Sequence, residues 1–442
     1  MNNSASHPAA LQLVARFDRN LIYTQGESVR FLVIDVQAPT IKTEARPKDP
    51  LNLALVIDAS GSMSGVPIEA AKAAAVRVTE QLGESDLLSV VSFDTNVTVH
   101  MNAAPQGPGG RSTSAAAIGA LQAGSSTDLS GGWLKGCECV AARMDSSHAL
   151  RNRAVVFSDG HANSGILDPQ ALGAHAAELR VRGLLSSTVG IGDDYSDMQL
   201  EAIASHGGGR MHHAARPEEI AELVLAELEE LRATVVDSVE VVVRVPPRVR
   251  LEVVGDYAAR PEAGGNTVAL GSLTSGSSRS VVFKVTCPPG TEGDTVAIQI
   301  GARWKPAGVD GSLDLSPQSC DLTFATVTEC GTQHRDQELA TRVARIWQLS
   351  VVRVATRLNQ DGALERAKQY LEQELKHLSR YCKDLAGGTE LLRSLVRMHE
   401  SVGMMYGRGA AKEMLVASSK ALRNDRDFRE RPQSSWDSNL PS

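Results

Sequence analysis

The chain has 442 residues, of which 42% are hydrophobic and 22% are charged, and its formal net charge is −7. This length suffices for two to four domains of roughly 100 to 200 residues each, and the composition is that of an ordinary globular protein with a sizeable core. The negative charge argues against binding of a nucleic-acid backbone as the main activity. No apolar stretch approaches the roughly 20 residues that a membrane-spanning helix needs.

The N-terminal sequence MNNSASHPAALQLVARFDRN lacks the basic start and the apolar stretch of a secretory signal. We therefore expect the chain to remain in the cytoplasm. Cysteine usage agrees with this expectation. Cys137 and Cys139 are separated by one residue, which is not the usual zinc spacing, and no matching His/Cys pair accompanies them. We expect all six cysteines to be free thiols in a reducing compartment.

Strands are predicted at the start of the chain, within residues 8–46. Leu11 to Phe17 and Val29 to Val36 have strand-like patterns and are joined through a turn at Gly26. Two strands are too few to fold alone. This segment therefore needs further strands from elsewhere in the chain to form a stable sheet.

Residues 48–234 are predicted to form a doubly wound α/β domain, because apolar runs alternate there with helical patterns. The first strand, Leu51 to Ile57, is an almost unbroken apolar run, as expected of a strand buried on both faces. The next helix, from about Pro67 to Leu82, has a proline near its start and Gly83 past its end. Further strands are predicted at 87–93, 97–100, 153–158, 184–191 and 211–214, and further helices after residue 127 and at 169–182, 197–205 and 217–232.

Oxygen-bearing side chains follow the first strand of this domain. The sequence DASGSMSG, residues 58 to 65, places the Asp58 carboxylate and the Ser60 and Ser62 hydroxyls on one tight turn. Hard oxygen ligands at alternate positions suit Mg²⁺, Mn²⁺ or Ca²⁺ rather than zinc. In doubly wound sheets the loops at the carboxyl ends of the strands form the ligand crevice. The turn therefore predicts a divalent-metal site.

The pattern Asp-x-Ser-x-Ser resembles the metal-ion-dependent adhesion site of von Willebrand factor A domains. That family places a threonine on a second loop and an aspartate after a later strand. Here Thr127 stands in SSTDLSGG, and Asp159 follows the predicted strand Ala154 to Ser158. Two serines occupy the place where the family often has two glycines, which affects the geometry of the loop rather than ligation. The resemblance implies that Mg²⁺, or alternatively Mn²⁺ or Ca²⁺, is held by Asp58, Ser60, Ser62, Thr127 and Asp159.

The resemblance also implies a function. Three neutral oxygens and at most two carboxylates leave a divalent ion poorly neutralised, with one coordination position open to water. An Asp or Glu carboxylate of a partner protein could displace that water, so that the metal bridges two proteins. We therefore expect a non-catalytic, bacterial-type interaction or scaffold protein that recognises an acidic residue of its partner.

Other interpretations stay open. In one, the hydroxyls of Ser60, Ser62 and Thr127 only cap turns and helices. In another, a metal shapes the loops but recruits no partner. Similar A domains accompany ring ATPases in chelatase-like assemblies, which would make this chain an accessory subunit of such a machine. A metal-dependent hydrolase would need a general base, for which Asp159 is the one obvious candidate, and no set of nucleophile, base and orienting group is evident.

A strand-rich pattern returns after the α/β domain, and residues 235–330 are predicted to form a β-sandwich with strands near 239–245, 249–253, 280–286, 295–304 and 322–328. We expect the N-terminal strands to complete this sandwich, with the α/β domain inserted between its strands. The alternative is a separate sandwich with a loosely attached N-terminal arm. Residues 334–424 are predicted to form a small helical bundle, and residues 425–442 a disordered tail.

Overall fold

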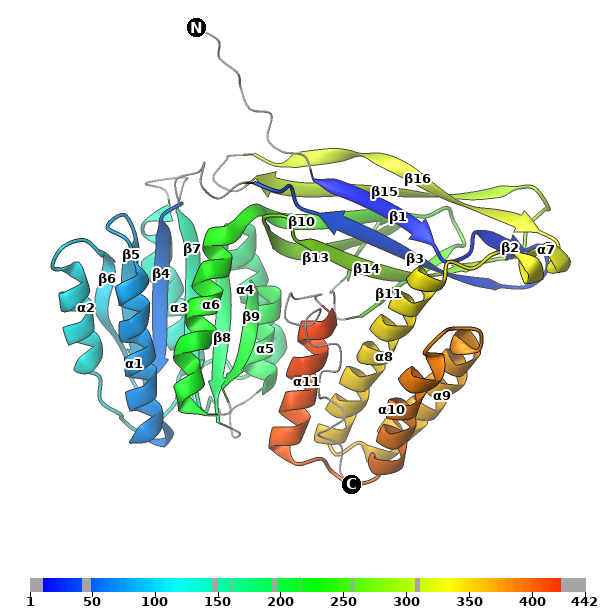
Figure 1. The fold of residues 1–442 in the computed structure, drawn as a ribbon. Helices are drawn as coiled ribbons and strands as arrows, with labels where there is room; N and C mark the ends of the chain where they lie inside the picture. Colours follow the sequence, from blue (N-terminus) through cyan, green and yellow to red (C-terminus); the bar gives the residue numbers. More distant parts are fainter. Residues whose placement is uncertain are drawn as a thin grey trace, which may run out of the picture. The chain divides into compact units, whose positions relative to one another are not determined.

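The computed structural model describes residues 11–41, 49–144, 150–159, 162–192, 197–214, 216–255, 257, 259–306 and 311–422 (Figure 1). The chain divides into two compact units. The α/β unit comprises residues 42–234 with 307–310, and the flanking unit comprises residues 1–41, 235–306 and 311–442. The α/β unit is thus inserted in the sequence between two parts of the flanking unit. The predicted tail, residues 425–442, lies outside the described residues.

The α/β unit is built on a six-stranded sheet with the order β6-β5-β4-β7-β8-β9. Its strands are β4 (Leu51–Asp58), β5 (Leu87–Phe93), β6 (Val97–Pro105), β7 (Arg151–Ser158), β8 (Leu184–Ile191) and β9 (Gly208–Ala214). All neighbours run parallel except β6, which is antiparallel to β5. From β4 the chain passes first to β5 on one side and later to β7 on the other side. The carboxyl end of β4 is therefore the topological switch point, where ligands bind in such sheets.

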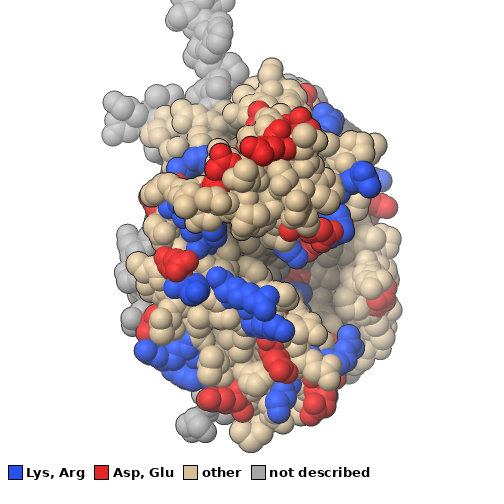
Figure 2. All heavy atoms as spheres, turned by 90° about the vertical axis from the view of Figure 1, so that its right-hand side faces the viewer, with Lys and Arg blue, Asp and Glu red and all other residues tan. Residues whose placement is uncertain are grey.

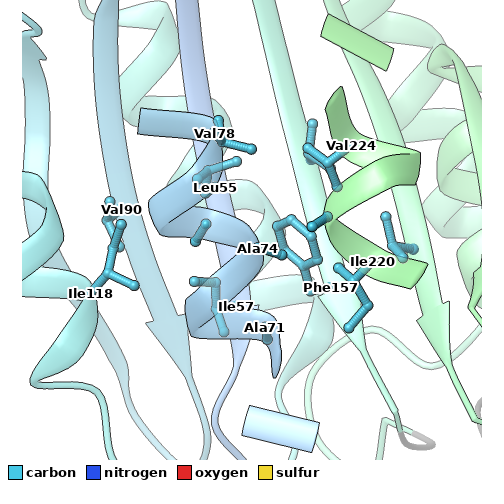
Figure 3. Close-up of a cluster of buried hydrophobic side chains, with 14 of the residues drawn as sticks. Leu55, Ile57, Ala71, Ala74, Val78, Val90, Ile118, Phe157, Ile220 and Val224 are labelled. Carbon is cyan, nitrogen blue, oxygen red and sulfur yellow. The ribbon is translucent and has the colours of Figure 1, made fainter. Parts of the chain in front are cut away.

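Helices cover both faces of this sheet. One face packs against α1 (Val66–Gln81), α2 (Gly110–Gly119) and α6 (Ile220–Ala233), and the other against α3 (Leu129–Ala141), α4 (Pro169–Val181) and α5 (Asp197–His206). Figure 3 shows the first of these layers, in which Leu55 and Ile57 of β4 and Phe157 of β7 meet the apolar stripes of α1 and α6. The doubly wound fold predicted from the sequence is confirmed.

Two glycines let α3 lie close to the sheet. A Cβ atom built on Gly132 would overlap the Phe93 ring, and one built on Gly136 would overlap a methyl group of Val56. Side chains at these positions would push the helix away from β4 and β5. Because α3 begins two residues after Thr127, its close seating also fixes the loop that carries this predicted site residue.

The flanking unit contains two antiparallel sheets that share one core. The four-stranded sheet has the order β1-β3-β14-β11, and the six-stranded sheet has the order β12-β13-β10-β15-β16-β2, in which β2 pairs with β16 in parallel. Their strands are β1 (Gln12–Phe17), β2 (Leu21–Tyr23), β3 (Ser28–Gln37), β10 (Thr234–Arg244), β11 (Arg250–Val254), β12 (Ala259–Glu262), β13 (Gly265–Thr274), β14 (Ser278–Cys287), β15 (Thr295–Pro306) and β16 (Leu313–Ala325).

The N-terminal strands complete this sandwich, as the sequence predicted. The whole of β3 pairs with β14, from Ser28 opposite Cys287 to Gln37 opposite Ser278. Apolar side chains from both sheets then meet in a single buried cluster. The chain segments before and after the α/β unit are therefore held together by main-chain hydrogen bonds and by a common core.

Helices α7 (Val327–Thr332), α8 (Gln337–Gln360), α9 (Leu364–Cys382), α10 (Gly388–Ser401) and α11 (Arg408–Leu422) follow the last strand. Phe31 and Val282 on the outer face of the four-stranded sheet pack against Val343 of α8. A buried ion pair between Asp18 and Arg335, 3.1 Å long, fastens the start of α8 to the N-terminal segment.

On the face shown in Figure 2, basic and acidic side chains lie interspersed.

Some elements differ from the sequence prediction. The strand predicted to run to Thr328 ends at Ala325, because Thr326 caps α7. The Thr326 hydroxyl accepts a hydrogen bond from the Glu329 amide, and the Glu329 carboxylate accepts one from the Thr326 amide, which is a complete capping box. Helix α2 and the hairpin of β12 and β13 were not predicted, because their short segments carry little hydrophobic periodicity.

Candidate functional site

Asp58 is the last residue of β4, and its side chain is 0% exposed. One carboxylate oxygen, Oδ1, accepts a hydrogen bond from the Ser60 amide at 2.9 Å. The other, Oδ2, accepts one from the Ser158 hydroxyl at 2.6 Å. The carboxylate therefore lies beneath the turn that follows β4, and it fixes the backbone of that turn.

The two serines of the turn lie beside the second predicted carboxylate. The hydroxyl oxygens of Ser60 and Ser62 are 3.0 Å apart, and the Ser62 hydroxyl donates a hydrogen bond to Oδ1 of Asp159 at 2.8 Å. Ser60 is buried and Ser62 is exposed, whereas Asp159 is half-buried. Asp159 directly follows β7, the strand next to β4. The structure thus brings together four of the five predicted site residues, with oxygens that extend from the interior to the surface.

Burial dominates the electrostatics of the two carboxylates. The pKa of Asp58 is raised to about 6. Burial is the main cause, the hydrogen bonds from Ser158 and Ser60 oppose it, and the negative charge of Asp159 adds to it. Burial also raises the pKa of Asp159, although its bond from Ser62 acts in the opposite direction. Within the described part of the chain, neither carboxylate forms an ion pair with a basic side chain.

Thr127, the fifth predicted residue, lies on a loop that is bonded to the same turn. The Gly61 amide donates to the Ser125 carbonyl at 3.2 Å, and the Gly124 amide donates to the Ala59 carbonyl. Thr127 itself is 5% exposed. Its hydroxyl makes no hydrogen bond to any residue that the structure describes, so this oxygen is available to a ligand.

Two residues at the site were missed by the sequence analysis. Ser158 donates to Asp58 because β7 lies beside β4 with Ile57 opposite Phe157, which places the ends of both strands together. Knowledge of the strand order would have revealed the contact between Ser158 and Asp58. Asn163 binds the loop of Thr127 through its side-chain oxygen. It lies in an irregular segment, and no sequence pattern indicates its partner.

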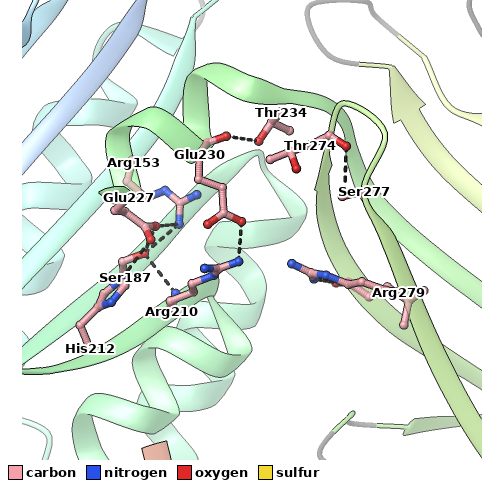
Figure 4. A network of polar contacts seen from close by, with 11 residues as sticks. Arg153, Ser187, Arg210, His212, Glu227, Glu230, Thr234, Thr274, Ser277 and Arg279 are labelled. Atoms are coloured by element: carbon pink, nitrogen blue, oxygen red, sulfur yellow. Dashed lines mark hydrogen bonds and ion pairs between the residues drawn. The ribbon is translucent and has the colours of Figure 1, made fainter. Parts of the chain in front are cut away.

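A second polar cluster in the α/β unit has balanced charges (Figure 4). The buried Glu227 carboxylate pairs with Arg153 at 2.9 Å and with His212 at 3.1 Å, and it accepts a hydrogen bond from Ser187 at 2.6 Å. Burial alone would raise the pKa of Glu227, but the positive charge of Arg153 and the hydrogen bond with His212 hold it well below its usual range. Because its charge is compensated within the protein, this cluster needs no added ion.

The chemistry of the donor set restricts the ion that the candidate site can accept. Among the described residues, no group of three or more His, Cys, Asp or Glu side chains could hold a metal ion. The candidate site instead combines two carboxylates with the hydroxyls of two serines and a threonine. Such all-oxygen sets fit hard divalent cations and do not fit zinc or copper, which favour nitrogen and sulfur.

The fold and the site define a doubly wound α/β domain with an oxygen-rich cluster at its topological switch point. Residues 52–226 match the family model of the von Willebrand factor type A domain. The α/β unit is therefore a domain of this type, as the sequence motif predicted. No helix in the described ranges is both long and apolar enough to cross a membrane.

Several proteins are similar to most of this chain. An uncharacterized protein of Synechocystis sp. is 26% identical over 348 residues, which are 76% of this chain and 80% of that protein. A solved von Willebrand factor type A protein from Catenulispora acidiphila, 17% identical, has a TM-score of 0.70 and covers 95% of this chain and 98% of its own. The ArnB paralog VWA2 from Sulfolobus acidocaldarius, 16% identical, has a TM-score of 0.57 with coverages of 95% and 99%. The folds of the α/β unit and of the flanking unit thus recur in other proteins.

Proposed function

We propose that the α/β unit binds one divalent cation, Mg²⁺ or alternatively Mn²⁺ or Ca²⁺, at the switch point of its sheet. The observation that carries this proposal is the pair of carboxylates with raised pKa values and no counter-charge among the described residues, surrounded by hydroxyl oxygens. Ionising both carboxylates at neutral pH is unfavourable in the protein alone. A bound cation would remove this penalty.

Each residue has a distinct role in this proposal. Ser60, Ser62 and Thr127 offer hydroxyl oxygens as ligands. Asp159 is half-buried and supplies negative charge directly or through water. Asp58 has both oxygens engaged in hydrogen bonds within the protein, so it orients the turn of Ser60 and adds a buried negative charge.

The bound cation would then act as a receptor for a partner protein. A hard divalent cation takes about six or more oxygen ligands, so the five side chains of this site leave a position that a further ligand can fill. An Asp or Glu carboxylate is the protein group that best fits this position, because hard divalent cations favour charged oxygen ligands and both oxygens of Asp58 are already engaged within the protein. The chain would thus be a non-catalytic, metal-dependent interaction or scaffold protein. We also propose a cytoplasmic location, which all six free cysteines support.

A peptide-selection experiment tests this function without knowledge of the natural partner. The immobilised full chain is panned against a random peptide library in the presence of Mg²⁺ and, separately, of EDTA. We expect peptides that bind only with Mg²⁺, that share an Asp or Glu, and that lose binding when this residue becomes Asn or Gln. Selected peptides that bind equally in EDTA, or that need no acidic residue, would contradict the proposal.

The same turn offers a matched pair of variants for this assay. Asp58→Ala removes a proposed site residue, and binding of the selected peptides should be lost. Ser64→Ala changes an exposed serine of the same turn that lies outside the motif. Its binding should equal that of the unchanged protein, which separates loss of the site from a general disturbance of the turn.

A further inference from the structure

We propose that Asn163 is a positioning residue of the metal site: by holding the backbone of Thr127, it fixes the direction of the Thr127 hydroxyl and thereby the affinity for the cation. This inference rests on the proposed metal-binding function. It concerns a residue outside the five-residue motif, from a segment that follows the motif's last member in the chain.

Asn163 engages both backbone groups of Thr127. The Asn163 side-chain oxygen accepts a hydrogen bond from the backbone N–H of Thr127 at 3.0 Å. The backbone N–H of Asn163 donates to the Thr127 carbonyl at 3.1 Å. The same side-chain oxygen accepts a second bond from the Ser126 hydroxyl at 2.6 Å. With its N–H and C=O both bonded to one residue, the backbone of Thr127 has little freedom to rotate. The direction of its Cα–Cβ bond is therefore fixed, and the few χ1 rotamers of a β-branched side chain limit where the hydroxyl can lie.

Residues after Asn163 strengthen this attachment. The Ile166 amide donates to the Ser130 hydroxyl at 2.8 Å, in the first turn of α3. Gly165 has a φ of +76°, and a Cβ atom there would overlap the Ser130 hydroxyl. The segment of residues 163–166 therefore lies closely against the start of α3 and cannot shift independently of it. Asn163 is thus itself held in place by its own segment.

The loop of Thr127 has other attachments that do not involve Asn163. The Ser125 carbonyl accepts from the Gly61 amide at 3.2 Å, and the Ser125 and Thr95 hydroxyls lie 2.8 Å apart. On the other side, Asp128 caps α3 by accepting a bond from the Gly131 amide at 2.9 Å. Loss of the Asn163 side chain should therefore leave the loop folded and loosen only the peptide of Thr127.

The side-chain chemistry predicts a specific pattern among variants. Asn163→Ala removes the acceptor for both donors. Asn163→Asp keeps an acceptor oxygen in the same place and so preserves both bonds. Changes to residues that orient metal ligands typically weaken affinity by about 10- to 100-fold. We therefore expect Mg²⁺ binding to be at least about tenfold weaker in Asn163→Ala. In Asn163→Asp it should be no weaker than in the unchanged protein, because the added negative charge also favours a cation.

Calorimetric titration of the full chain with MgCl₂ tests the proposal, with the melting temperature in EDTA as the measure of folding. Ser164→Ala, an exposed neighbour, is the matched control and should bind Mg²⁺ normally. Should Asn163→Ala fail to fold, Ser126→Ala removes one of the two side-chain bonds and should give a smaller loss. A purely structural role would lower the melting temperature in EDTA without a separate loss of affinity.

Two results would overturn the inference alone. Both apply when Asp58→Ala abolishes binding, so that the metal site itself is supported. The first is a normal Mg²⁺ affinity in Asn163→Ala, and the second is an equal loss of Mg²⁺ affinity in Asn163→Ala and Asn163→Asp. If the unchanged protein binds none of Mg²⁺, Mn²⁺ and Ca²⁺, or if Asp58→Ala binds them normally, the proposed function fails and the role of Asn163 fails with it.

Discussion

Replacement of Asp58 by asparagine should stabilise the metal-free protein at neutral pH, although it removes a proposed site residue. The amide oxygen of the new side chain can accept the bond from the Ser60 amide, and its NH₂ group can donate to the Ser158 hydroxyl, which is able to accept as well as donate. The shape and the hydrogen bonds of the site are thus preserved. What changes is the negative charge, which is buried without a counter-ion among the described residues.

The size of the effect follows from the raised pKa. The difference between the ordinary value of 3.8 and the value of about 6 in the folded protein corresponds to about 3 kcal/mol. Because the folded pKa is the higher one, the protonated carboxyl favours folding fully below pH 3.8, and this contribution is lost as the pH rises through 6. Above pH 7 the metal-free protein therefore carries the whole penalty, and at pH 5 it carries about half.

Calorimetric melting in EDTA measures this difference. At pH 7.5 we expect the Asp58→Asn variant to melt above the unchanged protein by about 5 °C or more, and the gap should narrow at pH 5. Addition of Mg²⁺ should raise the melting temperature of the unchanged protein but not that of the variant. The reasoning is refuted if the variant melts lower in EDTA at pH 7.5 by the same margin as at pH 5.

Two further changes test the packing and the charges of the α/β unit. In a urea titration, Gly136→Ala should lower the free energy of unfolding by about 1 to 3 kcal/mol, because the added methyl overlaps Val56. Gly119→Ala, whose added methyl would meet nothing, is the control and should be neutral or slightly stabilising. Glu227→Gln leaves Arg153 buried without its carboxylate and should cost about 3 to 5 kcal/mol at pH 7. This loss should shrink as the pH falls below the unfolded pKa of Glu, since a carboxylate with a lowered pKa contributes fully above that value and loses its contribution progressively as the pH falls toward the folded pKa.

Much of the site could be predicted from the sequence because parallel strands end at one edge of a sheet. The apolar run before Asp58 indicates a buried central strand, and a second such run precedes Asp159. Their carboxyl ends must lie at the same edge if the strands are neighbours, as they are. The serines follow Asp58 on the same turn, so their positions come with it.

The remaining features depend on information that a local pattern does not contain. The bond from Ser158 to Asp58 requires the order of the strands, and the bonds of Asn163 require the path of an irregular loop. Helix α7 is different, since the capping box of Thr326 and Glu329 was present in the sequence and could have revealed the end of β16. Sequence periodicity therefore predicts long elements well, whereas contacts between loops need the folded chain.

The location of a bound cation tests the central proposal most directly. Crystals of the full chain grown with MnCl₂ and measured at the manganese absorption edge would show the ion by its anomalous scattering. We predict one strong peak in contact with the hydroxyls of Ser60 and Ser62 and close to Thr127 and Asp159. Absence of a peak at this position, with the ion bound elsewhere or not at all, would contradict the account.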